Sequence, residues 1–149
     1  MSIRVYLEKN VTPEVVEEAL PLIRALHKEV KGTELVGLNA EYFQNAMTAD
    51  VMRAVAARDG PTLVGFLVMY VCKSALGVQE ATITHIFVDK KYRGKTHAVG
   101  AQMISVALAI VDALGIRCEY IAEKEHVINL FLQAGFKPAG IKMGYNNGK

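Results

Sequence analysis

The sequence predicts a mixed α/β domain in which a central sheet carries helices on both faces. Runs that favour strands alternate along the chain with runs of helical periodicity. Two of the strand-like runs are joined by an Asp-Gly-Pro turn, and residues 83–114 read as strand, short basic loop and long apolar helix. The expected order is β-α-α-β-β-β-α-β-α-β, with antiparallel hairpins and one right-handed parallel crossover.

The N-terminal part of this order rests on periodicity and on helix start signals. Residues 3–7 alternate between apolar and polar side chains, which predicts a half-buried strand. A helix is expected to follow, with Thr12 as its N-cap and Pro13 at its first position. Pro21 lies inside this helix and is predicted to kink or split it. A shorter helix is expected over residues 38–49.

Strands and helices with clear stop signals make up the rest of the chain. Residues 51–58 and 62–72 predict a hairpin, and residues 80–88 predict the next strand. A helix from residue 98, a short buried strand and a second helix follow, and glycines end both helices, at positions 115 and 135. Residues 136–145 are expected to form a last strand that Pro138 weakens.

Composition indicates one soluble domain over residues 1–149. Hydrophobic residues make up 52% of the chain, and the net charge of +2 is too small to favour nucleic-acid binding as the main task. The N-terminus lacks the apolar core of a signal peptide, and the most apolar segment, residues 101–116, is shorter than the ~20 residues of a membrane span. We therefore expect a cytoplasmic protein with no membrane partner. Histidines and cysteines are scattered without ligand spacing, so no metal site is expected.

The junction Val88-Asp-Lys-Lys-Tyr-Arg-Gly-Lys-Thr-His-Ala98 predicts a phosphate site. It lies where a strand ends and a helix begins, and a helix N-terminus offers unpaired N–H groups to anions. Arg93 and Lys95 add positive charge, and Gly94 allows close approach of the backbone. The alternative is that these are solvated loop charges. Asp89 stands where a P-loop would have its upstream glycine, so that motif is incomplete.

Two segments of the sequence resemble the motifs of the GNAT-type N-acetyltransferases. The acetyl-CoA loop of that family follows Gln/Arg-x-x-Gly-x-Gly/Ala; here Arg93 matches the first position, Ala98 the last, and Thr96 replaces a glycine. The run VINLFLQAGF resembles the second motif, whose positions are filled by Val127, Ile128, Leu130, Phe131, Gly135 and Phe136.

The resemblance implies a GNAT-like fold and transfer of acetyl from acetyl-CoA to a primary amine by direct attack in a ternary complex. The acceptor, a small-molecule amine or a protein lysine or N-terminus, would lie between residues 30–39 and the C-terminal strand. The backbone N–H of Val88 would polarise the thioester carbonyl. Residues implied to bind the cofactor are Phe87, Val88, Arg93, Gly94, Lys95, Thr96, His97, Ala98 and Phe131.

The catalytic positions depart from the family pattern. Thr82 and Thr84 stand where many members have a glutamate base, and Phe131 stands where the family has a tyrosine proposed as the acid. Candidates for the base are His85 and Glu80, with Glu123 and Glu125 as others at strand and helix ends. We expect the His85 side chain on the opposite face from the two threonines, unless a bulge turns it.

Two further features leave alternatives open. After Phe136 the chain has room for one strand where the family usually has two, so a partner subunit in a homodimer is one way to cover the open edge. The losses at the acid and base positions favour an alternative function, a non-catalytic acyl-CoA-binding or interaction protein on the same fold. A phosphate-binding protein unrelated to coenzyme A is a third possibility.

Overall fold

A computed structural model describes residues 3–8, 12–31, 41, 45, 51–94, 98–121, 125–140 and 143–145. The helix expected over residues 38–49 falls almost entirely outside these ranges. The described elements, in chain order, are β1 (Ile3–Leu7), α1 (Pro13–Lys31), β2 (Met52–Asp59), β3 (Thr62–Lys73), β4 (Gln79–Val88), η1 (Lys90–Tyr92), α3 (Val99–Leu114), β5 (Arg117–Tyr120) and α4 (Glu125–Gln133).

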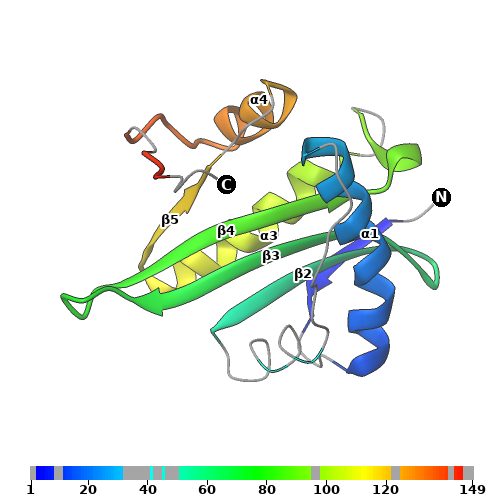
Figure 1. The fold of residues 1–149 in the computed structure, drawn as a ribbon, viewed down its shortest axis with the longest axis horizontal. Helices are drawn as coiled ribbons and strands as arrows, with labels where there is room; N and C mark the ends of the chain where they lie inside the picture. The colour runs from blue at the N-terminus through cyan, green and yellow to red at the C-terminus, as the bar shows by residue number, and fades with distance from the viewer. Residues whose placement is uncertain are drawn as a thin grey trace.

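The predicted mixed sheet is confirmed. It has five strands in the order β1-β2-β3-β4-β5 (Figure 1). Neighbours among β1 to β4 pair antiparallel, whereas β4 and β5 pair parallel and are joined through α3. Gly60 sits in the β2–β3 turn with a φ of 59°, a value that glycine adopts without steric cost.

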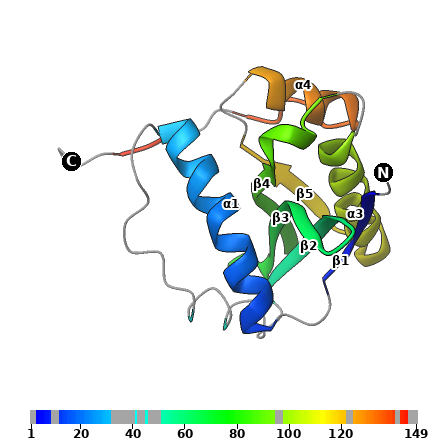
Figure 2. The same cartoon turned by 90° about the vertical axis from the view of Figure 1, so that its right-hand side faces the viewer.

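Helices cover both faces of the sheet, as the sequence predicted (Figure 2). α1 packs on one face and α3 on the other, so the apolar residues separate into two clusters. The cluster on the α3 side includes Leu67, Met69, Ile83, Ile86, Met103 and Ile104. The cluster on the α1 side includes Val16, Ala19, Ile23, Phe66 and Phe87. The sheet is therefore buried on both sides over its central strands.

α1 is one continuous helix, so of the two effects predicted for Pro21, a kink or a split, the split is wrong. The Thr12 hydroxyl accepts a hydrogen bond from the Val15 N–H at 3.4 Å, which agrees with its predicted role as N-cap. Pro21 lies on the exposed side, while Val16, Leu20 and Ile23 are buried against the sheet. This packing offsets the hydrogen bond that proline cannot donate.

An ion pair fixes α1 to the edge of the sheet. The Arg58 guanidinium on β2 donates to both Glu18 carboxylate oxygens, at 2.8 and 3.0 Å, and its Nε donates to the Tyr6 hydroxyl at 2.8 Å. The hydrogen bond from Arg58 lowers the pKa of the Glu18 carboxyl. The pair joins β1, β2 and α1 and holds the helix in register with the strands beneath it.

The last predicted strand is wrong in the part of the C-terminal segment that the structure describes. Residues 136–140 and 143–145 form no strand, which agrees with the missing ladder donor at Pro138 and the flexible backbone at Gly140. Within the described residues, β5 thus has β4 as its only strand neighbour. None of the described helices is both long and apolar enough to cross a membrane.

Candidate functional site

The two parallel strands β4 and β5 separate before β4 ends. Their pairing runs from Glu80 and Arg117 to Ile83 and Tyr120, and β4 then continues to Val88 without a partner on that side among the described residues. Figure 1 shows β5 turning away from the second half of β4. Residues 84–88 therefore present one edge of an extended backbone, which is a surface that a linear ligand can pair with.

The backbone of Val88 points to this open edge. The Asp89 N–H donates to the Val64 carbonyl of β3 at 2.8 Å, so the backbone groups of Asp89 face β3. In an antiparallel pair, successive residues turn their N–H and C=O groups to opposite sides. The Val88 groups consequently face away from β3, and the Arg93 Nε donates to the Val88 carbonyl from that side at 2.9 Å.

A β-bulge at Thr84 decides the position of His85. Val68 on β3 pairs with His85 whereas Met69 pairs with Ile83, so Thr84 is the extra residue. The bulge shifts the alternation of side chains and places His85 on the α1 face. There its ring stacks on that of Phe87, with 5.5 Å between centroids. The sequence predicts His85 on the opposite face from Thr82 and Thr84 unless the strand carries a bulge. The structure has that bulge, so His85 does not lie on the opposite face.

Thr84 also favours one tautomer of the exposed His85 imidazole. The Thr84 hydroxyl donates to the Val68 carbonyl at 3.4 Å, and its oxygen lies 3.1 Å from Nδ1 of His85. A hydroxyl that donates to a carbonyl can accept from the imidazole, and this arrangement requires the proton of the neutral ring to be on Nδ1. Nε2 then carries the lone pair, as a general base requires.

The loop after β4 retains the strand-to-helix junction that the sequence predicted. Gly94 is exposed with a φ of 110°, and a Cβ atom there would meet no atom within 4 Å. Glycine is therefore favoured at this position by the backbone conformation and not by a lack of space. Ala98 is the N-cap of α3 with a φ of 50°, a conformation that costs an alanine about 1 kcal/mol. Lys95, Thr96 and His97 lie outside the described residues.

A hollow of about 480 Å³ adjoins the end of β4. It is lined by Leu22, Ala25 and Lys28 of α1 and by Phe87, Val88, Asp89, Lys90 and Arg93. Three predicted site residues, Phe87, Val88 and Arg93, therefore meet at one place. Lys28 and Lys90 were missed by the sequence analysis, since only the packing of α1 on the sheet brings Lys28 to this point. Their positive charges suit an anionic ligand.

Phe131 does not line this hollow and belongs instead to an aromatic cluster. Its ring stacks on Tyr120 with 4.0 Å between centroids and meets Phe136 edge to face at 4.9 Å. Only 4% of Phe131 is exposed. Tyr120 is the last residue of β5 before the strands part, so the cluster fills the space on the β5 side and holds α4 there.

Glu80 is separated from the other predicted site residues. It is exposed at the start of β4 and pairs with Arg117, whereas Val88 ends the same strand. Eight residues of extended chain span roughly 26 Å, so the structure does not bring Glu80 to the hollow. Glu123 lies outside the described residues. Among those that are described, no group of three His, Cys, Asp or Glu side chains could hold a metal ion.

Comparisons with known proteins agree with this geometry. Residues 17–136 match the acetyltransferase (GNAT) family. No curated protein matches the chain. One similar solved structure is a ribosomal-protein-alanine N-acetyltransferase from Brucella melitensis biovar Abortus 2308, with 19% identity, 97% of both chains covered and a TM-score of 0.67. Another is an aminoglycoside acetyltransferase from an uncultured soil metagenomic sample in complex with sisomicin, with 14% identity, 97% of this chain and 95% of that chain covered and a TM-score of 0.76.

Proposed function

Because the chain belongs to the GNAT acetyltransferase family, we propose that it moves acetyl from acetyl-CoA to a primary amine by direct attack in a ternary complex. The observation that carries the proposal is the outward-facing backbone of Val88 on the open edge of β4, next to a hollow with positive charge from Lys28, Lys90 and Arg93. The acceptor is a small-molecule amine or a protein lysine or N-terminus. The proposed location is the cytoplasm.

The open edge of β4 suits the linear arm of acetyl-CoA. The pantetheine amides can pair with a strand edge as an added strand would, and the outward N–H of Val88 is placed to stabilise the oxyanion that forms at the thioester carbonyl. The phosphates are expected at the junction of residues 93–98. Arg93 and Gly94 are its described members, and Lys95, Thr96 and His97 remain predictions beside Ala98.

His85 is the proposed general base. With the proton on Nδ1, which the contact with Thr84 favours, Nε2 is an acceptor, and His85 lies three residues before Val88 on the same strand. Three residues of extended chain span roughly 10 Å, so the proton of the attacking amine reaches Nε2 through water. Phe131 has no hydroxyl with which to act as an acid. A thiolate whose conjugate acid has a pKa of ~8.5 can leave without that help.

A non-catalytic acyl-CoA-binding protein is the second candidate. It is favoured by Thr82, Thr84 and Phe131, none of which can serve as base or acid in the way the family pattern implies. A thiol-release assay with acetyl-CoA and a panel of amines, amino acids and peptides separates the two. Release above background with any acceptor supports the transferase, and tight coenzyme A binding without release supports the alternative.

Removing the Arg93 side chain is expected to weaken acetyl-CoA binding by roughly 10-fold, because a charge-assisted hydrogen bond to phosphate is lost. Gly94→Trp should also weaken binding, since a residue with a side chain is strained at a φ of 110°. Calorimetric titration of both variants beside the parent measures this, and Lys137→Ala is an exposed control on the C-terminal segment. Equal affinities in all four proteins would remove the site assignment.

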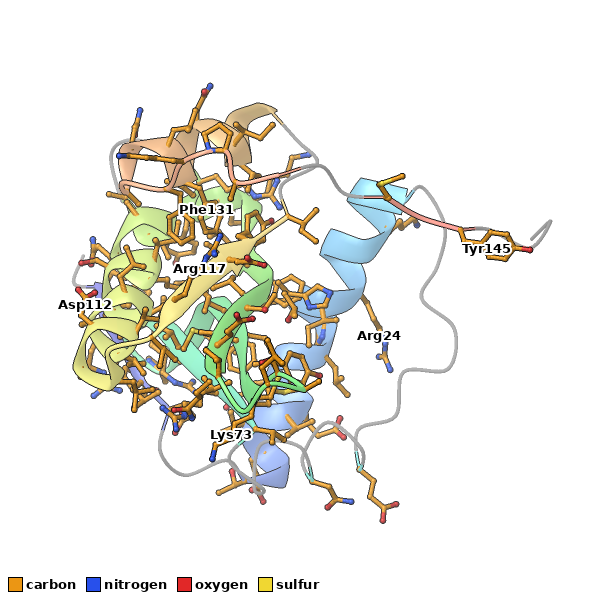
Figure 3. The ribbon with its side chains drawn as sticks, turned by 90° about the vertical axis from the view of Figure 1, so that its left-hand side faces the viewer. Arg24, Lys73, Asp112, Arg117, Phe131 and Tyr145 are labelled. Carbon is orange, nitrogen blue, oxygen red and sulfur yellow. The ribbon has the colours of Figure 1, made fainter. Side chains whose placement is uncertain are left out.

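We also propose a homodimer that covers the outer edge of β5. The described residues place no strand on that edge. Met143 and Tyr145 are 90% and 92% exposed, and Figure 3 shows Tyr145 projecting away from the rest of the chain. Sedimentation velocity at micromolar concentration should give twice the mass of one chain. A single species with the mass of a monomer would contradict this.

A further inference from the structure

A hydrogen bond joins the loop after β4 to the turn end of the β2–β3 hairpin. The Tyr92 hydroxyl in η1 donates to the Asp59 carboxylate at the end of β2, at 2.7 Å. This hydrogen bond raises the pKa of the Tyr92 phenol, so the phenol remains a donor over the whole working range of pH. Both partners lie at the end of the sheet where β4 stops, as Figure 1 shows for η1 and the β2–β3 turn.

The start of this loop is held by the backbone. The Asp89 N–H donates to Val64 at 2.8 Å, the Asp89 side chain accepts from the Lys91 N–H at 2.9 Å, and the Tyr92 N–H donates to the Asp89 carbonyl at 2.8 Å. These bonds fix Asp89 to β3 and close the single turn of η1. They do not join Tyr92, the last residue of η1, to the sheet.

The Asp59–Tyr92 pair makes that second connection. The Tyr92 ring packs against the cluster on the α3 side, and its hydroxyl reaches across to β2. Arg93 follows directly in the chain and returns to the end of β4, where its Nε donates to the Val88 carbonyl. The direction of the chain as it leaves Tyr92 therefore sets where the Arg93 guanidinium can lie.

We propose that Asp59 and Tyr92 are positioning residues for Arg93, and through it for the phosphate-bearing part of the ligand. The inference rests on the proposed function, because it assigns Arg93 to that ligand. Neither Asp59 nor Tyr92 is among the residues that line the hollow. Their part is to limit the positions of Arg93 before binding, which lowers the entropy cost of ordering it.

The test is a calorimetric titration of coenzyme A into Tyr92→Phe, Asp59→Ala and Asp59→Asn, with thermal unfolding of each protein. Tyr92→Phe keeps the ring and removes only the hydroxyl, so affinity is expected to fall roughly 3- to 10-fold while the protein stays folded. Asp59→Ala should have a similar effect. Asp59→Asn keeps an acceptor oxygen and should recover most of the parent affinity. Tyr145→Phe is the matched control at an exposed tyrosine.

The outcomes separate this inference from the proposed function. If the parent does not bind coenzyme A, the proposed function fails. If the parent binds and folded Tyr92→Phe binds equally well, only the positioning role fails. Equal losses in Asp59→Asn and Asp59→Ala would also overturn it, since a carboxylate charge and not the hydrogen bond would then matter. Adding Arg93→Ala to Tyr92→Phe should cause little further loss if the pair acts through Arg93.

Discussion

Replacing His85 by glutamine is expected to lower kcat by about 10²- to 10³-fold while the KM for acetyl-CoA changes by less than about threefold. The amine must lose a proton as it attacks, and His85 is the base that the bulge turns toward the α1 face. Glutamine keeps a group that can hydrogen bond with Thr84 but cannot take up the proton.

Two neighbouring positions provide the controls for this experiment. Thr82→Val alters an earlier residue of the same strand and is expected to leave kcat unchanged. Thr84→Val removes the oxygen that lies 3.1 Å from Nδ1, so it should lower kcat by a few-fold through loss of the favoured tautomer. If His85→Gln retains kcat within about threefold of the parent, another group takes the proton and the assignment of His85 is wrong.

The limits of sequence-based prediction are clear from β4. Its bounds were predicted to within one residue, since β-branched and aromatic residues and a following turn mark them. The bulge at Thr84 was not predictable, because it depends on which β3 residues lie opposite. The face on which His85 lies depends on how β4 pairs with β3. The hydrophobic periodicity of β4 alone carries no information about this register, so the sequence could not show whether His85 is placed to act as a base.

Other differences arise from contacts between distant segments. Lys28 reaches the hollow only because α1 packs across the sheet, and Asp59 meets Tyr92 only because the β2–β3 turn and η1 share one end of it. The split predicted at Pro21 does not occur, since local propensity does not include the burial that holds α1 together. The glycine at 115 was predicted correctly because a left-handed helix end is a local requirement.

Truncating Phe131 to alanine is expected to destabilise the protein by about 3–5 kcal/mol, which is the usual cost of removing a buried aromatic ring. The ring is 4% exposed, stacks on Tyr120 and meets Phe136 at its edge, so little can move in to fill the space. For a domain of this size the loss corresponds to a fall in Tm of roughly 10 °C. Thermal unfolding followed by circular dichroism measures it.

The next residue on the same helix supplies the comparison. Leu132 is 46% exposed, so Leu132→Ala should cost less than about 1 kcal/mol. Phe131 lies beside the end of β5, close to the point where β4 and β5 separate. Phe131→Ala should therefore also weaken acetyl-CoA binding by the protein that remains folded, whereas Leu132→Ala should not. Equal shifts in Tm for the two variants would show that the buried Phe131 ring contributes no more to stability than an exposed side chain does.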